Sequence, residues 1–414
     1  MQPLIGLCIL LLLIILLRWL LMPCDPSITL PPPAPMDHSA CDMEATAQRI
    51  KLAPKTGLCY LVIGTGSVGT SIIEALLERG EEHVKGFDIA HNAALGRRIV
   101  MIQGNVTKLA DLTAACQGVD VVFSTFALIR FAERLHFQYA ASHAVNVTGT
   151  ANTIAACQAA SVRVLVVTST SNCCVSPVAC KERHRTAFDE TSRYVDAEQS
   201  PNHYGWTKVQ AEQLALAANG SAASADGTRR LSVACLRPCS AIFGPTDTFI
   251  CQKWLDNGEC QLVTPEPIID WVYVENVTWG HLLLERKLLD SPTAVGGLAF
   301  CVSGEQPLTA GDFYAKLGVF YKATTGTPLK FTYLPRRLMI LLSYVIEAIQ
   351  WLTHGAIKGE AAQLTPAMFA IARCSYTFSS QRACELLGYK PLYTVDEGLQ
   401  RTVSKWDEAR KTKR

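Results

Sequence analysis

An apolar run that stops at three closely spaced glycines limits the possible folds of this chain more than any other feature. Residues 58–63 indicate a buried strand, and Gly64, Gly66 and Gly69 follow it directly. Gly64 permits a tight turn, Gly66 lets a bound group approach the backbone, and Gly69 allows a helix to pack closely on the strand. Residues 71–79 have helical spacing. The pattern therefore predicts a strand, a turn and a helix whose N-terminus stabilises an anionic group.

An acidic residue follows at the spacing that a dinucleotide site requires. Asp88 stands at the end of a second short apolar run, 84–87, and lies 19 residues after Gly69. A carboxylate there accepts hydrogen bonds from the adenosine ribose and repels a 2′-phosphate, which favours NAD over NADP. Arg97 and Arg98 are close enough in the sequence to keep NADP open. A tight turn that binds no cofactor is the alternative. The predicted contacts of NAD in this part of the chain are Gly64, Gly66, Ser67, Val68, Gly69 and Asp88.

Strands and helices alternate through the first half of the chain after residue 56. Further buried strands are predicted at 119–123, 162–167 and 231–236, with helical stretches between them. This alternation predicts an α/β fold with a doubly wound parallel sheet, of the Rossmann type, over residues 56–245. The pattern then loosens, so residues 246–414 are expected to form a smaller substrate-binding and membrane-associating region, parts of which return to the first domain.

A tyrosine and a lysine one helical turn apart predict the catalytic groups. Tyr204 and Lys208 lie on the same face of a predicted helix, and the ammonium group is expected to lower the pKa of the phenol. A phenolate can take the proton of a substrate alcohol while nicotinamide accepts the hydride. Hydroxyl side chains at 168–171 follow a buried strand, at the sheet edge where ligands bind in open α/β folds. A purely structural Tyr/Lys pair is the alternative.

The N-terminal residues differ in kind from the rest. Residues 4–22 are apolar apart from Arg18 and are long enough to span a bilayer core. We therefore expect residues 1–22 to be an uncleaved membrane anchor, with a cleaved signal peptide as the alternative. Prolines make 23–55 a linker, and Arg18 weakly favours a cytoplasmic body. A second apolar stretch, 338–352, is expected to be a buried helix or to lie in the membrane interface.

Composition excludes some partners. The net charge is +2, which argues against binding to nucleic acid. The 16 cysteines include no CxxC pair, so we expect mostly reduced, buried thiols and a body that faces a reducing compartment. The sequence leaves the oligomeric state open, a homodimer included.

These motifs together resemble the extended short-chain dehydrogenases/reductases, and more narrowly the 3β-hydroxysteroid dehydrogenase family. The resemblance covers about residues 57–408 and is nearest to the branch that oxidises and decarboxylates 4α-carboxysterols. The chain departs from the family pattern at Ile63, where a further glycine is usual, at Asn105, where an aspartate is usual, and at 124–127. The residues that carry the resemblance are 86–89, 145–150, 204–208, 211–212, 236–238, 242–245, 270–277, 296–297, 299–300 and 387–391.

The resemblance implies a role for each matching residue. Tyr204 becomes the catalytic base, and Lys208 its partner and a ligand of the nicotinamide ribose. Thr170 stands where the family usually has serine, and Asn146 matches the helix asparagine beside the proton-relay water. Asn105 would lie near adenine, and Pro238 and Ser240 would line the nicotinamide end.

The implied function is NAD(P)-dependent oxidation of the 3β-hydroxyl of a 4α-carboxysterol with loss of CO2, in sterol biosynthesis and without a metal. The expected place is the endoplasmic reticulum membrane, with the catalytic domain facing the cytoplasm. Three alternatives remain at this stage. They are a 3β-hydroxysteroid dehydrogenase/isomerase, a nucleotide-sugar epimerase or reductase, and a non-catalytic NAD-binding protein.

Overall fold

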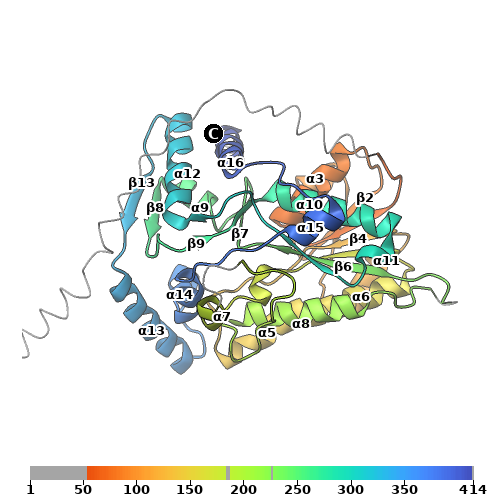
Figure 1. The fold of residues 1–414 in the computed structure, drawn as a ribbon, viewed down its shortest axis with the longest axis horizontal. Coiled ribbons are helices and arrows are strands. Elements are labelled where there is room, and N and C mark those ends of the chain that lie inside the picture. Colours follow the sequence, from red (N-terminus) through yellow and green to blue (C-terminus); the bar gives the residue numbers. More distant parts are fainter. Residues whose placement is uncertain (1–53, 183–186, 225–226, 413–414) are drawn as a thin grey trace, which may run out of the picture.

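A sheet of seven parallel strands organises the chain (Figure 1). The computed structural model describes residues 54–182, 187–224 and 227–412. The strand order is β3-β2-β1-β4-β5-β6-β11, and it reverses direction between β1 and β4, where open α/β sheets form their binding crevice. The prediction of a doubly wound parallel sheet is therefore confirmed. The strands are β1 (Tyr60–Ile63), β2 (Val84–Asp88), β3 (Val100–Gln103), β4 (Val121–Ser124), β5 (Val164–Thr168), β6 (Ser232–Pro238) and β11 (Ala299–Val302).

Helices cover both faces of this sheet, which explains why its central strands are apolar throughout. Along β1, Tyr60 and Val62 pack toward one core, and Leu61 and Ile63 pack toward the other. The first core is closed by α3 (Ser67–Glu78), α10 (Val274–Asp290) and α15 (Gln381–Leu387). The second is closed by α4 (Leu109–Ala115), α6 (Gly149–Ala159) and α8 (His203–Ala217), with α5 (Tyr139–His143) and α7 (Pro177–Glu182) beside the last.

A second region lies beside the carboxyl ends of the strands (Figure 1). It contains three two-stranded sheets and five helices, while α10, α11 (Pro292–Val295), β11 and α15 return to the large sheet. The strand pairs are β7 (Ala241–Phe243) with β10 (Trp271–Tyr273), β8 (Glu259–Leu262) with β13 (Lys330–Tyr333), and β9 (Ile268–Ile269) with β12 (Leu308–Thr309). The helices are α9 (Gln252–Asn257), α12 (Ala310–Thr325), α13 (Arg336–Leu352), α14 (Pro366–Ala372) and α16 (Val395–Thr412).

Helix α13 has an apolar face that the described residues leave exposed. Only Ser343 and Gln350 of this helix are buried, whereas Leu342, Trp351 and Leu352 are exposed. The expectation of a buried helix at 338–352 is therefore wrong, and the interfacial alternative stays a prediction. None of the helices in the described ranges is long and apolar enough to cross a bilayer. The expected anchor, 1–22, and all but the end of the expected linker, 23–55, lie outside the described residues.

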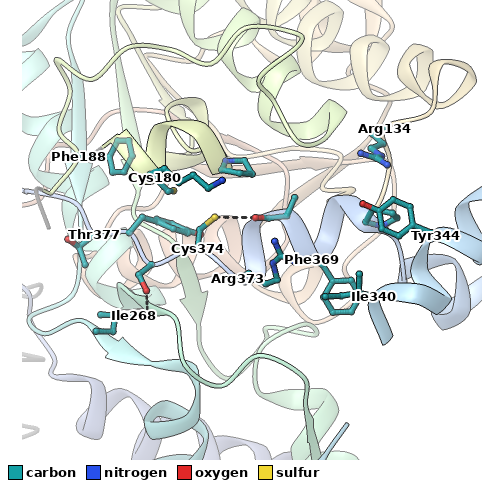
Figure 2. Close-up of a pocket in the computed structure, with 16 residues that line it drawn as sticks. Arg134, Cys180, Phe188, Ile268, Ile340, Tyr344, Phe369, Arg373, Cys374 and Thr377 are labelled. Atoms are coloured by element: carbon teal, nitrogen blue, oxygen red, sulfur yellow. Dashed lines mark hydrogen bonds between the residues drawn. The ribbon is translucent and has the colours of Figure 1, made fainter. Parts of the chain in front are cut away.

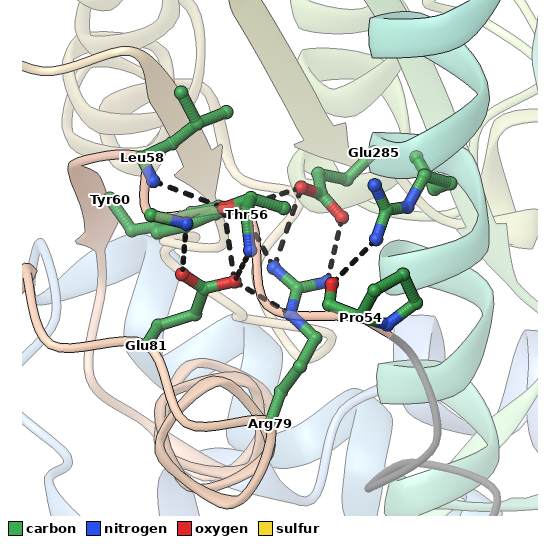
Figure 3. A network of polar contacts seen from close by, with 9 residues as sticks. Pro54, Thr56, Leu58, Tyr60, Arg79, Glu81 and Glu285 are labelled. Carbon is green, nitrogen blue, oxygen red and sulfur yellow. Dashed lines mark hydrogen bonds and ion pairs between the residues drawn. The ribbon is translucent and has the colours of Figure 1, made fainter.

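A buried ionic network fixes the start of β1 against two helices (Figure 3). Arg79 after α3 contacts Glu81 and Glu285, with N–O distances of 3.0 Å each. The Tyr60 hydroxyl donates to Glu285 at 2.8 Å. All three charged side chains are at most 1% exposed, so each charge depends on its partners for the solvation that water would supply.

Candidate active site

The glycine turn forms an open cradle at the N-terminus of α3. Gly64 has φ +93°, and a Cβ there would lie 2.6 Å from the backbone nitrogen of Phe126. A Cβ on Gly69 would lie 1.9 Å from the carbonyl oxygen of Gly64. A Cβ on Gly66, in contrast, would meet no atom within 4 Å. The turn is therefore packed tightly on its protein side and open on the side where backbone N–H groups can hold a pyrophosphate.

Asp88 at the end of β2 joins this turn. Its Oδ2 accepts hydrogen bonds from the Thr65 backbone at 2.6 Å and from Thr65 Oγ1 at 3.0 Å. Its Oδ1 accepts a longer bond of 3.3 Å from Ala90, which leaves acceptor capacity for ribose hydroxyls. Arg98 is paired with both carboxylate oxygens of Glu74, beside a cavity of about 320 Å³ that Gly66 and Ser67 also line. The carboxylate of Asp88 favours a ribose 2′-hydroxyl over a 2′-phosphate, and Arg98 pairs with Glu74 at the exposed edge of this site.

Asn105 serves its own loop in this structure. Its Oδ1 accepts hydrogen bonds from the backbone and hydroxyl of Thr107 at 3.0 and 2.9 Å. Its backbone nitrogen donates to Asp111. The adenine contact expected for Asn105 stays a prediction.

Helix α8 brings the predicted tyrosine and lysine together. Asn202 caps its N-terminus by accepting from Gly205 N at 2.9 Å, so the helix begins at His203. Tyr204 and Lys208 then lie on one face, 5% and 4% exposed. The ammonium group of Lys208 donates to the backbone oxygen of Thr168 at 2.8 Å, which fixes it at the carboxyl end of β5.

The pKa of Tyr204 moves opposite to the expected direction. Burial raises it above its usual value, although a hydrogen bond with Thr170 acts to lower it. Burial also lowers the pKa of Lys208. The effect of the ammonium group on the tyrosine pKa stays a prediction, because burial is the largest influence on that pKa and Lys208 is not among the groups that shift it.

Phe131 is one of the side chains that bury Tyr204. Its ring lies edge-on to Tyr204, with 5.0 Å between ring centroids. The ring of Phe249, which is more than half exposed, lies on the outer side of Phe131, with 6.2 Å between the two ring centroids. The two aromatic rings thus extend from the phenol toward solvent.

The structure places Thr170 beside Tyr204, as expected, and adds a residue that the sequence analysis missed. The Thr170 hydroxyl oxygen accepts from both the backbone nitrogen and Nδ2 of Asn172, each at 3.2 Å. Two accepted bonds leave the hydroxyl proton free to donate toward Tyr204. Asn172 lies in a short 3₁₀ turn with no periodicity, so the sequence carried no signal for this contact.

His281 of α10 supports the lysine from the other face of the sheet. Its Nδ1 lies 2.8 Å from the carbonyl oxygen of Val277, which only accepts, so Nδ1 carries the proton. Its Nε2 therefore accepts from the Thr168 hydroxyl at 2.7 Å. Burial lowers the pKa of His281 to about 4 and keeps the ring neutral. His281 thus fixes Thr168, and the backbone oxygen of Thr168 in turn fixes Lys208.

Asn146 lies in a π-helical turn (Ala144–Thr148). Its Nδ2 donates to Leu128 O at 3.2 Å and to Thr207 Oγ1 at 3.0 Å, and its Oδ1 accepts from Leu128 N at 2.8 Å. These bonds tie the loop after β4 to α8. Positioning of this loop is the role that the geometry supports, and the expected proton-relay role stays a prediction.

Pro238 ends β6, and Ser240 follows with the unusual φ of +56°. The backbone nitrogen of Ser240 donates to Ser171 Oγ at 2.9 Å, which joins this turn to the loop that carries Thr170. The structure therefore brings the two predicted nicotinamide-end residues beside the predicted catalytic loop, although it does not test their contact with a cofactor.

A cavity of about 640 Å³ lies between α7, α13 and α14 (Figure 2). Its apolar walls include Ile268, Ile340 and Phe369, and its charged lining consists of Arg134, Lys181 and Arg373. Arg134 follows Phe131, the ring on Tyr204, by three residues, whereas Tyr204, Lys208 and Thr170 are not among the residues that line the cavity. The sequence analysis missed this cavity because its walls come from segments more than 200 residues apart.

Comparisons with known proteins place this geometry among dehydrogenases. The model of the 3-beta hydroxysteroid dehydrogenase/isomerase family matches residues 61–331. Mouse sterol-4-alpha-carboxylate 3-dehydrogenase, decarboxylating, is 28% identical over 366 residues, covering 87% of this chain and 93% of that protein. Human 3 beta-hydroxysteroid dehydrogenase type 7 is 32% identical over 365 residues, covering 84% and 95%.

Solved structures show the same fold at lower identity. UDP-glucose 4-epimerase from Stenotrophomonas maltophila, with bound NAD and formylated UDP-arabinopyranose, has a TM-score of 0.63 and 18% identity. The match covers 86% of this chain and 100% of the epimerase chain. UDP-glucose 4-epimerase from Thermotoga maritima has a TM-score of 0.60 and 17% identity, with 85% and 99% covered. At these identities the likeness establishes the fold alone.

Proposed function

Because the chain belongs to the 3-beta hydroxysteroid dehydrogenase/isomerase family, we propose that it oxidises the 3β-hydroxyl of a 4α-carboxysterol with NAD and releases CO2. The observation that carries the proposal is the buried Tyr204, hydrogen-bonded to Thr170 and one helical turn from Lys208. Several relatives bear the name sterol-4-alpha-carboxylate 3-dehydrogenase and match over most of their length. The family name and these relatives support an oxidoreductase that acts on a CH–OH group.

The chain's own residues supply binding and proton transfer. The cradle at Gly66 and the carboxylate of Asp88 fit the pyrophosphate and ribose of NAD, which supplies the hydride acceptor when bound. Thr170 donates a hydrogen bond that can hold the substrate oxygen, and the Tyr204 oxygen takes its proton.

Loss of CO2 follows from the product of the first step. Oxidation at C3 places a ketone next to the carbon that bears the carboxylate. The electron pair of the breaking C–C bond passes into the ketone as an enolate, which then takes a proton. The step needs no catalytic group beyond those that hold the substrate.

The cavity of about 640 Å³ suits an amphipathic acid. Its apolar walls can bury a ring system, since ligand pockets of this size bury most of a small molecule's surface. Lys181 and Arg373 line it, and either cation can pair with a carboxylate. We therefore assign substrate binding to this cavity, which residues between 246 and 414 enclose together with Arg134, Lys181 and other residues of the cofactor domain, 56–245.

Membrane association belongs to the same proposal. The exposed apolar side of α13 fits a helix that lies in the headgroup region, where a sterol is presented. Together with an anchor at 1–22, it supports our proposal that the enzyme lies on the endoplasmic reticulum membrane with its body toward the cytoplasm. Vesicle flotation of the chain lacking residues 1–53, with and without Leu342→Asp and Trp351→Glu, tests the contribution of α13. Flotation that does not depend on these substitutions would remove α13 from the proposal.

The activity is tested by supplying a 4α-carboxysterol and NAD to membranes that contain the full chain. NADH, CO2 and the 3-ketone are the expected products. Tyr204→Phe should abolish turnover and leave the melting temperature unchanged, with Tyr194→Phe as a tyrosine control outside the site. The absence of all three products would refute the proposed reaction, and activity in Tyr204→Phe would refute the role of the phenol.

The 32% identity with human 3 beta-hydroxysteroid dehydrogenase type 7 favours a second candidate, a substrate without the carboxylate. The two candidates differ in their need for cavity cations. If the substrate is the acid, Arg373→Met should raise KM for the carboxylated sterol and leave KM for NAD unchanged. If an uncarboxylated 3β-hydroxysteroid turns over faster and is insensitive to Arg373→Met, the second candidate replaces the first.

A further inference from the structure

Two cysteines from distant parts of the sequence meet in the wall of the large cavity (Figure 2). Cys180 lies on α7, and Cys374 follows the end of α14. Both line the cavity, both are partly exposed, and their thiols are hydrogen-bonded to each other. Neither residue takes part in the proposed oxidation of the sterol, so the pair needs a separate account.

The surroundings of the pair favour one proton on two sulfurs. Lys181 and Arg373, each adjacent in sequence to one of the cysteines, also line the cavity. The hydrogen bond from Cys180 and the charges of Arg373 and Lys181 lower the pKa of Cys374 to about 7, whereas the same hydrogen bond raises the pKa of Cys180. As a thiol, Cys374 donates to Ala370 O at 3.1 Å, and ionisation gives up this bond while keeping the one from Cys180.

From this juxtaposition we infer that Cys180 and Cys374 form a reactive dithiol site in the cavity wall, which peroxides convert reversibly into a disulfide. The site combines the features of redox-sensing cysteines: a thiolate stabilised by cations, access from solvent, and a second thiol within reach. Cys116 and Cys157 are also hydrogen-bonded, but both are fully buried in the core, so peroxide cannot reach them in the folded protein.

The chemistry requires a peroxide and balances in two steps. The Cys374 thiolate attacks hydrogen peroxide, which forms an S–O bond, breaks the O–O bond and releases hydroxide. The resulting sulfenic acid is attacked by the sulfur of Cys180, which forms the S–S bond and releases water after the thiol proton is transferred. The two sulfurs lose two electrons in total, and the peroxide gains them.

The disulfide would join α7 covalently to the segment after α14, so two walls of the cavity would move as one. It would also remove the thiolate from the neighbourhood of Lys181 and Arg373. Both effects act on the space that we assign to the substrate and therefore rest on the proposed function, whereas formation of the bond does not.

Thiol reactivity tests the site without any substrate. At pH 7 a pKa of about 7 instead of 9.0 makes about 50 times more thiolate, and the lower intrinsic nucleophilicity takes back about a factor of ten. We therefore expect Cys374 to react with iodoacetamide about fivefold faster than an ordinary exposed thiol, with half-maximal rate near pH 7. Cys384 on α15 is exposed and provides the internal comparison in the same digest. Equal labelling of Cys374 and Cys384 across pH 6–9 would overturn the assignment.

Disulfide formation is tested on the full chain with stoichiometric hydrogen peroxide. Peptide mapping without reductant should recover a fragment that joins residues 180 and 374, and dithiothreitol should separate it. Cys180→Ser should instead leave a sulfenic acid on Cys374 that dimedone traps, and Cys384→Ser should behave as the unmodified chain. Failure to find the joined fragment, with no dimedone adduct in Cys180→Ser, would refute the proposal whatever the sterol assay shows.

Discussion

Replacing Gly66 with alanine should separate cofactor binding from folding. Gly66 has φ −70° and ψ −161°, which alanine adopts without strain, and its added Cβ would meet no protein atom within 4 Å. Alanine stiffens the unfolded chain, which stabilises the folded protein, but it is a weaker N-cap than glycine, which destabilises it. Because these effects oppose each other, we expect the free energy of unfolding to change by less than about 0.5 kcal/mol.

The same methyl group would occupy the open side of the cradle, where the pyrophosphate approaches the backbone. Loss of two hydrogen bonds from backbone N–H groups to charged oxygens costs about 3 kcal/mol or more. Since about 1.4 kcal/mol is a factor of ten, the affinity for NAD should fall by at least ~100-fold. Calorimetric titration with NAD measures this fall, and thermal unfolding in the absence of NAD measures the stability.

Gly69→Ala is the matched control because its methyl group points into the protein. The Cβ would lie 1.9 Å from the Gly64 carbonyl oxygen and 2.8 Å from the Thr125 hydroxyl, so α3 must shift away from β1. Overpacking of this kind costs about 1–3 kcal/mol, and the melting temperature should fall by several degrees even without NAD. Wild-type affinity for NAD in Gly66→Ala would refute the placement of the pyrophosphate, and an unchanged melting temperature in Gly69→Ala would refute the packing argument.

Three further predictions follow from contacts described above. The pKa of His281 is about 4 in the folded chain and ~6.5 in the unfolded chain, so stability present above pH 6.5 is lost as pH falls toward 4, by up to about 3 kcal/mol. In urea unfolding at pH 7 and 4.5, the free energy of unfolding should depend less steeply on pH in His281→Gln than in the wild type. Glu285→Ala leaves a buried guanidinium short of a partner and should cost about 3–5 kcal/mol in chemical unfolding, whereas Glu82→Ala, on an exposed carboxylate, should have no measurable effect. Asn172→Ala removes one hydrogen bond to Thr170, worth about 1 kcal/mol, and should lower kcat roughly fivefold while KM for NAD stays constant; an unchanged kcat would remove the positioning role of the amide.

Local patterns predicted the fold well where the signal lies within one continuous segment. The strand at 58–63, the turn and α3 follow from apolar runs and glycine spacing, and the motif at 204–208 lies on one helix face as expected. Strand β3 was missed because it is at the sheet edge, where Val100 is 62% exposed and the apolar pattern is weak. Strand β11 was also missed, because it pairs with β6, a strand more than 60 residues earlier in the sequence.

Contacts between distant segments were beyond the sequence pattern. Nothing in the residues near Thr168 indicates that His281 accepts a hydrogen bond from its hydroxyl, because the pairing arises only when α10 packs on the sheet. The direction of the Tyr204 pKa was predicted wrongly for the same reason, since burial beneath Phe131 is a property of the tertiary structure. Charge and spacing predicted which groups react, and packing determined the direction of the pKa shift of Tyr204.

The bond between His281 and Thr168 has a consequence for exchanging parts of this enzyme with its relatives. The ammonium group of Lys208 depends, through two hydrogen bonds, on a ring contributed by a helix from the opposite layer. A chimera that imports residues 274–290 from a donor lacking a hydrogen-bond acceptor at position 281 would fold around the same sheet but loosen the anchor of Lys208. The presence of a hydrogen-bond acceptor at position 281 therefore decides which carboxyl-terminal halves can be grafted without loss of turnover.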